Sequence, residues 1–412
     1  MRHLLWLLGL CLPLAVLAAG KAPVDRARRY EERLKAVKQE DPGSWIALAD
    51  FCEQWTLLDK REEALEKAVS LDPGCAAARV RLDQRLLDGE WLSADRADAA
   101  EAQALEAEGK VFYGAAWIDA EEAGKQRALD RKEIGWDAGF RIDTPRLRIY
   151  TDAPLGVGRR LAAILENEIE TYRRFHPKGF CPEKSLADLA SRKLKVFLCW
   201  DPQTFRKVAG PVWIANGGRS MSPDIGGFYD PKTRVLYVSH NPEDASLRLL
   251  TLTAVHELFH GLDDVLGGIT PAKIPRWLVE GRACHFGWAV RGRQVLPGHV
   301  QFAELEAYPD VIEQMGRTAR LGDLVRMDKN AFGASPANYI ASWALTHFLF
   351  HAEEGRHAEG FRRFLSGLPA GKGSKRDLDQ AVGDLAKLEA PFRAYVLDVL
   401  VPAAQASRGN PP

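Results

Sequence analysis

The sequence predicts an α+β protein in which a helical region precedes a mixed domain. Two stretches of different pattern indicate this fold class. Residues 22–140 carry mainly helical spacing, and from about residue 141 apolar and polar residues begin to alternate as in half-buried strands. The composition fits a large globular chain, because 412 residues with 46% hydrophobic and 27% charged residues suit two or three domains.

These patterns divide the chain into consecutive parts. A signal peptide is expected at residues 1–19 and an α-helical, repeat-like region at 20–140. A catalytic domain is expected at 141–300, with its C-terminal helical part at 301–401. Residues 402–412 are expected to form a disordered tail, since chain ends that are not tied down are commonly disordered.

The amino terminus predicts export of the protein. Arg2 and His3 precede an apolar run at residues 4–17, and the small residues 18–20 offer a cleavage site. This pattern is typical of a secretory signal peptide. The run is shorter than the roughly 20 apolar residues that span a bilayer, and no later segment is long enough. We therefore predict a secreted or periplasmic protein with no stable membrane span after signal cleavage.

The cysteines that remain after this cleavage are odd in number, which leaves no complete disulfide framework. Their spacing does not resemble a structural zinc site. We expect buried free thiols, with a bridge between Cys52 and Cys75 as the alternative. The residues concerned are Cys52, Cys75, Cys181, Cys199 and Cys284.

The helical region contains two internal echoes. The runs DPGSWIALAD and DPGCAAARVR begin at Asp41 and Asp72, and EALEKAVSLDP between them resembles the second helix and exit turn of a tetratricopeptide repeat. The runs GEWLSAD (89–95) and AAWIDAE (115–121) each place a Trp before an acidic helix start, which suggests two small capping turns. Such helices either pack on the neighbouring domain or bind a partner protein.

The mixed domain begins with strand patterns. Residues 146–150 alternate as a half-buried strand, 161–175 form an amphipathic helix, and 194–200 form a more apolar strand. A hairpin follows, in which residues 226–229 pair with residues 234–238. An edge strand in this position can bind an extended peptide through main-chain hydrogen bonds.

The run TAVHELFHG contains an HExxH motif formed by His256, Glu257 and His260. It lies within residues 247–266, whose Leu and Val spacing is helical. Residues four apart share one face of a helix, so the two imidazoles can bind a single cation. A catalytic zinc needs three protein ligands and an open position for water, and a neighbouring carboxylate takes the proton from that water. The alternative is an ordinary core helix with two satisfied histidines.

A third ligand follows in the run PRWLVEG. Glycines and prolines between residues 267 and 275 break the first helix, and a second helix is expected from about Arg276. Glu280, in its first turns, can then return to the metal. Asp263 and Asp264 are interpreted as supporting partners or solvated caps, because one short helix rarely presents three ligands to a tetrahedral ion.

HELFH followed by WLVEG resembles the gluzincins of the peptidase MA-like superfamily. In that superfamily the two His and the later Glu bind zinc, and the Glu within HExxH is the general base. The resemblance implies that His256, His260 and Glu280 bind one catalytic Zn²⁺ and that Glu257 is the base. It also implies a zincin-like fold, in which a twisted sheet carries the HExxH helix and C-terminal helices complete the domain.

Details of the motif narrow the resemblance. WLVEGRA is closer to the aminopeptidase branch than to the thermolysin branch, in which an Asp four residues after the ligand Glu steadies a histidine; Cys284 stands there instead. No GxMEN motif is present, so aminopeptidase specificity is not implied. The metzincin pattern fails, because Asp263 and Leu266 stand where that class needs other residues. The whole chain also resembles uncharacterised secreted bacterial proteins with tetratricopeptide-like helices before an HExxH domain.

Other residues are candidates for supporting roles. Tyr339 in NYIASWAL is expected to stabilise the oxyanion, because relatives place a tyrosine on a later helix; a core role is the alternative. His285 is a second candidate and a fallback ligand, and Arg282 is interpreted as structural. His347 and His351 also have helical spacing but lack an adjacent Glu, so we interpret them as ordinary histidines. The final helices are expected at residues 339–350, 358–365 and 376–400.

The sequence thus predicts a secreted zinc metallopeptidase, most simply an endopeptidase acting on a peptide or protein substrate. The alternative is a noncatalytic scaffold or binding protein, in which the helical repeats recognise a partner and the zincin-like domain is degenerate. The intact positions of the motif favour activity. The net charge is zero and basic residues do not cluster with aromatic residues, so no nucleic-acid partner is expected.

Overall fold

The computed structural model describes residues 26–55, 57–177, 179–218, 220–222, 225–300, 320–333 and 335–403. The expected signal peptide at 1–19 and nearly all of the expected tail lie outside these residues. Within them the chain is α+β, with a five-stranded mixed sheet and many helices, as the sequence predicted. No helix among the described residues combines the length and the apolar character that crossing a membrane requires.

The N-terminal region begins with four helices that share a small core of their own. Leu48 and Cys52 pack against Leu65 and Ala68 between the second and third helices. The side chain of Asp41 accepts a hydrogen bond from the Gly43 N–H and so caps the second helix. The helices are α1 (Arg26–Lys35), α2 (Pro42–Gln54), α3 (Leu58–Leu71) and α4 (Ala76–Arg81).

The next segment differs from the expected helices and capping turns. Each Trp-containing run forms the second strand of an antiparallel hairpin, and a helix follows at once, so a hairpin–helix unit occurs twice. Trp91 pairs with Leu86, and Trp117 pairs with Phe112 in the same register. The units are β1 (Gln84–Leu87), β2 (Glu90–Ser93), α5 (Ala94–Ala107), β3 (Lys110–Tyr113), β4 (Ala116–Asp119) and α6 (Ala120–Ile134).

The central sheet has the strand order β5-β6-β7-β9-β8. Strands β6, β7 and β9 are parallel, and β5 and β8 pair antiparallel at the two edges. The hairpin expected at 226–238 is therefore present, with β8 as an edge strand. The bounds are β5 (Phe140–Asp143), β6 (Leu147–Thr151), β7 (Leu194–Cys199), β8 (Gly227–Asp230) and β9 (Val235–Ser239).

Long helices connect the strands and cover the sheet. The crossover from β6 to β7 contains α7 (Leu155–Phe175) and α8 (Glu183–Arg192), and α9 (Pro202–Ala215) follows β7. Helix α7 starts six residues before the amphipathic segment expected from residue 161. Gly158 in its first turns leaves space for the sheet, because an added Cβ would lie 2.7 Å from Cδ1 of Ile142.

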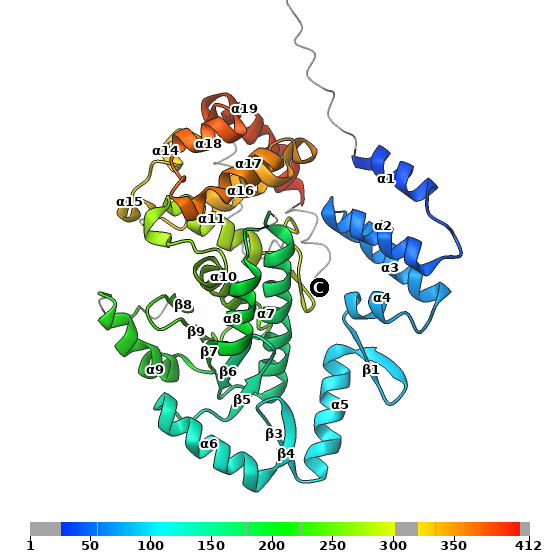
Figure 1. Ribbon diagram of the computed structural model, residues 1–412, viewed down its shortest axis with the longest axis vertical. Helices are drawn as coiled ribbons and strands as arrows, with labels where there is room; N and C mark the ends of the chain where they lie inside the picture. The colour runs from blue at the N-terminus through cyan, green and yellow to red at the C-terminus, as the bar shows by residue number, and fades with distance from the viewer. Residues whose placement is uncertain are drawn as a thin grey trace, which may run out of the picture.

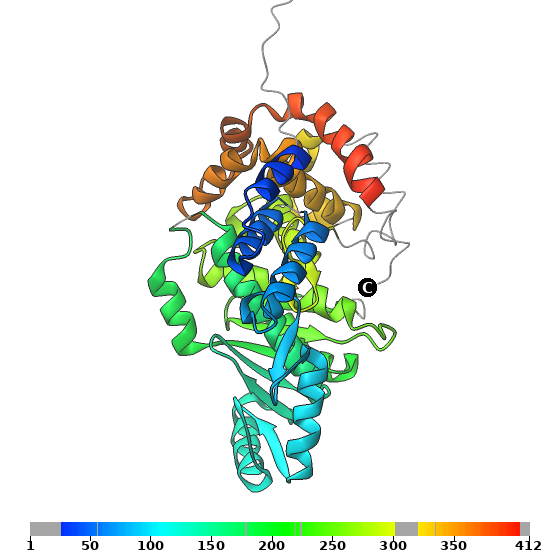
Figure 2. The ribbon, with the colours of Figure 1, turned by 90° about the vertical axis from the view of Figure 1, so that its right-hand side faces the viewer.

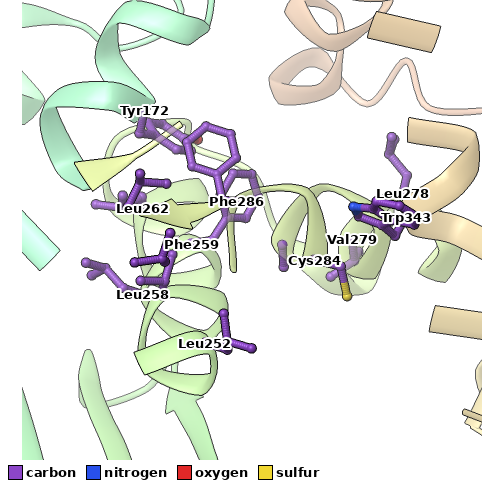
Figure 3. Packing of buried hydrophobic residues seen from close by; sticks show 14 of the residues in the cluster. Tyr172, Leu252, Leu258, Phe259, Leu262, Leu278, Val279, Cys284, Phe286 and Trp343 are labelled. Carbon is purple, nitrogen blue, oxygen red and sulfur yellow. The ribbon is translucent and has the colours of Figure 1, made fainter. Parts of the chain in front are cut away.

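Helices α10 and α11 occupy the two helical segments that the sequence predicted. Helix α10 (Arg248–Val265) contacts the sheet, and α11 (Arg276–Gly287) packs on α10 after the short turn η1 (Pro271–Lys273). Figure 3 shows Phe259 of α10 and Phe286 of α11 together beside Tyr172 of α7. The two phenyl centroids are 4.8 Å apart, so these aromatic residues join three helices in one core.

The C-terminal helices gather at one end of the molecule, and α5 and α6 lie at the opposite end (Figure 1). The segment expected as one helix at 376–400 is instead interrupted at Gly383, whose φ of 98° is incompatible with a continuing helix. The elements are α14 (Leu321–Leu324), α15 (Lys329–Gly333), α16 (Ala337–His351), η2 (Ala352–Gly355), α17 (Ala358–Ser366), η3 (Leu368–Ala370), α18 (Lys375–Val382), α19 (Leu385–Tyr395) and the π-helical turn η4 (Val396–Leu400).

A small hairpin after α11 connects the N-terminal region to the domain. It consists of β10 (Val290–Arg291) and β11 (Gln294–Val295). Arg291 forms an ion pair with Glu62 of α3, and the side chain of Gln294 donates a hydrogen bond to the carbonyl of Arg81. In Figure 2, turned by 90° from Figure 1, the N-terminal helices stand in front, toward the viewer.

Candidate metal centre

Helix α10 presents two imidazoles on one face. His256 and His260 are one turn apart, and their Nε2 atoms are 3.2 Å from each other. The opposite face is apolar: Leu258, Phe259 and Leu262 are fully buried in the core beneath. Because burial fixes the rotation of α10 about its axis, the two histidines point away from the apolar core.

Helix α11 adds a carboxylate to this pair. Oε2 of Glu280 lies 3.1 Å from Nε2 of His256 and 3.7 Å from Nε2 of His260. Four ligands held at about 2.0–2.2 Å around a tetrahedral ion stand roughly 3.3–3.6 Å apart. The separations of the donor atoms are close to this range. Within the described residues, this is the one group of three such side chains whose donor atoms converge.

The close approach of α11 to its neighbours depends on two glycines. A Cβ on Gly287 would lie 3.2 Å from Cβ of His256, and a Cβ on Gly281 would lie 2.4 Å from the carbonyl oxygen of Ser342 in α16. Side chains at these positions would push α11 away from α10 or α16. Gly281 of the WLVEGRA run thus allows the close approach to α16, and Gly287, four residues after that run, allows the close approach to His256.

The electrostatics of the cluster keep Glu280 ionised. Burial alone would raise the pKa of Glu280, but His260 and His256 outweigh it and hold that pKa well below 4.5. Arg276, one turn earlier, adds an ion pair of 2.6 Å to the other carboxylate oxygen. A carboxylate that stays charged at neutral pH is the form that binds a cation.

Glu257 lies between the cluster and the edge strand. Its carboxylate accepts a hydrogen bond of 3.1 Å from the Tyr229 N–H in β8. Gly227, in the same strand, must be glycine, because an added Cβ would lie 2.8 Å from the carbonyl oxygen of Tyr237 and 3.4 Å from Cγ of Glu257. The strand and the carboxylate are thus in direct contact.

Tyr339 stands at the start of α16, half-buried. Burial and the charge of Glu280 raise its pKa, while Arg276 and His256 act in the opposite direction. Tyr339 is thus coupled electrostatically to Glu280, Arg276 and His256. Because its pKa is raised, the hydroxyl remains a hydrogen-bond donor at neutral pH.

The structure does not bring His285 to this cluster. Its Nε2 lies 2.9 Å from Nε2 of His351, on the side of α11 that faces α16. His347 accepts or donates at both ring nitrogens: Nε2 is 3.1 Å from the carbonyl of Gly298, and Nδ1 is 2.8 Å from the hydroxyl of Tyr395. His285 as a fallback ligand was therefore wrong, and the interpretation of His347 and His351 as ordinary histidines agrees with these contacts.

The two aspartates of α10 do not touch the donor atoms. Asp263 is buried and forms a two-pronged ion pair with Arg282, and it also accepts a hydrogen bond of 2.6 Å from the Tyr172 hydroxyl. Asp264 accepts a hydrogen bond from the Tyr229 hydroxyl instead. Arg282 is structural, as the sequence predicted, and Asp263 is its partner rather than a support for a metal ligand.

One buried residue next to the cluster was missed. Glu168 in α7 is fully buried, and both of its carboxyl oxygens lack a hydrogen-bond partner. A signal was present in the sequence: Glu168 occupies a position in the apolar stripe that also contains Leu161, Leu165 and Tyr172. A charged residue in such a stripe indicates a polar function inside the core.

Cys52 and Cys75 form no disulfide, so the alternative of a bridge between these two was wrong. A scan against protein-family models and a search of the curated proteins found no match to this chain.

Proposed function

We propose that this chain is a secreted or periplasmic zinc-dependent metallopeptidase that hydrolyses peptide bonds. The observation that carries the proposal is the convergence of His256, His260 and Glu280, with Glu257 beside them against the edge strand β8. Two neutral imidazoles and one carboxylate are a donor set of catalytic zinc, which leaves a fourth position for water or substrate.

The surrounding architecture supports a zincin-like domain. Helix α10 lies against a mixed sheet whose edge strand is antiparallel, and C-terminal helices follow. The α2–α3 pair supports a tetratricopeptide-like element at the N-terminus. The ion pair between Glu62 and Arg291 favours packing on the domain over recognition of a partner protein as the role of these helices.

Each residue of the site then has a chemical role. A zinc ion held there would supply Lewis acidity toward a carbonyl and would make a water molecule acidic. Glu257 takes the proton from the attacking water and passes it to the leaving amine. The phenol of Tyr339 donates a hydrogen bond to the oxygen on which negative charge develops.

The edge strand suggests how a substrate is held. Strand β8 pairs with β9 on one side and ends the sheet order on the other. A substrate in extended conformation can add to such an edge through main-chain hydrogen bonds, without a demand for particular side chains. Because Glu257 contacts Tyr229 in the middle of β8, a bond held beside that residue would face the base. This arrangement supports endopeptidase activity.

The first experiment measures metal content. Residues 20–412 would be purified and analysed by mass spectrometry beside the variants His260→Ala and Glu280→Ala. We expect close to one zinc per wild-type chain and its loss in both variants, because each variant removes one of three protein ligands. A wild type that binds no zinc sinks the site assignment.

The second experiment measures cleavage with a quenched peptide library. Glu257→Gln is the matched variant, since it keeps the size and polarity of the side chain and removes the base. We expect zinc to remain and the rate to fall about 10²- to 10⁴-fold, the usual contribution of a general base. Stoichiometric zinc in a wild type that cleaves no peptide would favour the noncatalytic alternative.

A further inference from the structure

The second ring nitrogen of His256 is the starting point. Its Nε2 faces Glu280 and His260, so Nδ1 points away from the cluster. An imidazole that binds a metal through Nε2 carries its proton on Nδ1, and this N–H almost always donates to a carboxylate, a carbonyl or water. What Nδ1 contacts therefore decides how firmly His256 is oriented.

The group at Nδ1 of His256 is a thiol. Sγ of Cys284 lies 3.7 Å away, and its side chain is buried. Cys284 follows Glu280 by one helical turn, so α11 presents a ligand and a contact to another ligand on one face. Figure 3 shows Cys284 on α11 near Val279. A sulfur acceptor is weaker than the oxygen acceptors usual at this position.

A second polar group comes from helix α7, which packs against α10. The carboxyl of Glu168 comes from α7, is enclosed in the core and has no hydrogen-bond partner. Burial raises its pKa well above 4.5, and His256 is the group that opposes this rise. A buried polar group without a hydrogen-bond partner lowers the free energy of unfolding by about 1–3 kcal/mol. The carboxyl of Glu168 is therefore a departure from ordinary core packing.

We propose that Cys284 and Glu168 are positioning residues for His256. The sulfur of Cys284 accepts the Nδ1 hydrogen, and the buried carboxyl of Glu168 acts on the same imidazole from α7, the helix that packs against α10, so that Nε2 is held toward the metal. This inference rests on the proposed function, since it assumes that Nε2 of His256 is a zinc donor. Neither residue touches the substrate.

The test measures zinc affinity by chelator competition, together with the absorption spectrum of the Co²⁺-substituted protein. Cys284→Ala is expected to weaken zinc binding about 10- to 100-fold, the usual effect of losing an outer partner of a ligand, and to alter the cobalt bands. Glu168→Gln is expected to act in the same direction. The double variant should lose less zinc affinity than the product of the two separate fold-losses, because both residues act on one imidazole.

Two further variants separate positioning from packing. Cys199→Ala removes a fully buried thiol from the other face of the sheet, where it belongs to a separate core, and should leave zinc affinity unchanged. Cys284→Asp combined with Glu168→Gln supplies an oxygen acceptor at Nδ1 without placing two carboxylates together. This double variant should recover zinc affinity to the wild-type value or above it.

The outcomes distinguish this inference from the proposed function. Wild-type zinc affinity and cobalt spectrum in Cys284→Ala, with zinc lost in His260→Ala, would overturn the inference and leave the metal site standing. Equal losses in Cys284→Ala and Cys199→Ala would show a packing effect and would also overturn it. A wild type that binds no zinc would overturn both the inference and the proposed function. If Cys284→Ala does not fold, Cys284→Ser takes its place in the comparison.

Discussion

Two pairs of histidines with the same helical spacing behave differently in this molecule. His256 and His260 on α10 direct their Nε2 atoms to a common point, where Glu280 joins them. The rings of His347 and His351 on α16 are also close, with centroids 4.6 Å apart, but their nitrogens have other partners. His347 contacts Gly298 and Tyr395, and His351 contacts His285.

The difference teaches that spacing alone does not make a metal site. On both helices the i, i+4 spacing puts two rings on one face. On α10 a carboxylate from the next helix meets them, and the ring edges are partly exposed to solvent. On α16 the face is turned into the core, where other side chains and carbonyls satisfy the ring nitrogens. A carboxylate from a neighbouring helix, and a helix face that is open to solvent, distinguish the first pair of histidines from the second.

The largest expected effect comes from removing the partner carboxylate. Glu280→Ala should weaken zinc binding by more than about 100-fold, beyond the range expected for an outer partner of a ligand. His351→Ala, on the second pair, should keep the wild-type zinc affinity. Chelator competition on both variants measures this contrast. Equal zinc loss in the two variants would mean that both histidine pairs bind metal.

A pair of tyrosines extends the comparison to catalysis. Tyr339→Phe should lower kcat about 100-fold and leave KM nearly unchanged, since the hydroxyl is proposed to act on charge that develops only in the transition state. Tyr395→Phe removes the hydroxyl that contacts His347 of the second pair and should leave kcat as it is. Steady-state kinetics on a peptide cleaved by the wild type would give both values. A KM effect alone in Tyr339→Phe would indicate a binding role.

Two buried histidines, His285 and His176, should make the free energy of unfolding depend on pH. Burial, followed by the charges of neighbours such as His347 and Arg282, holds the pKa values of His285 and His176 well below 6.5. Because the folded pKa values lie below the unfolded value, their contribution is complete above about pH 6.5 and is lost as pH falls below it. In this range, each of the two histidines should lower the free energy of unfolding by about 1.4 kcal/mol for every unit by which the pH falls.

Urea unfolding between pH 7.5 and pH 5 measures this dependence, above the range in which most carboxylates titrate. His285→Phe should reduce the slope by about half, because one of the two buried histidines no longer takes up a proton on unfolding. An unchanged slope in this variant would assign the dependence to other groups.

The smallest expected effect concerns the hydrogen bond between Tyr395 and His347. Tyr395→Phe should lower the free energy of unfolding by about 1 kcal/mol, the usual net contribution of one hydrogen bond. Zinc content should be unaffected. Thermal unfolding of this variant beside the wild type provides the measurement, and a loss of zinc would show that the two clusters are coupled.

The convergence of His256, His260 and Glu280 was predictable from the sequence because its information is local. The HExxH spacing fixes two side chains on one helix face, and Pro275 marks the start of α11 one residue before Arg276. The edge hairpin was also predictable, from two short apolar runs around a turn at Asp230.

The first hairpin of the N-terminal region was missed because helical composition concealed a turn. Asp88 and Gly89 both have positive φ, 49° and 87°, the combination required by a tight two-residue hairpin turn. The Asp-Gly pair is the sequence signal for such a turn. The contact of Cys284 with His256 could not be read from spacing, since it depends on how α10 and α11 pack together.

The hairpin of β10 and β11 has a consequence for the order of folding. The hydrogen bond between Arg61 and Gln294 joins residues 233 positions apart in the chain. Contacts of such separation form slowly, because a long loop must close before they contribute stability. The N-terminal helices are synthesised first, yet they can dock only after the hairpin has formed on α7. The first part of the chain is therefore the last to reach its final place.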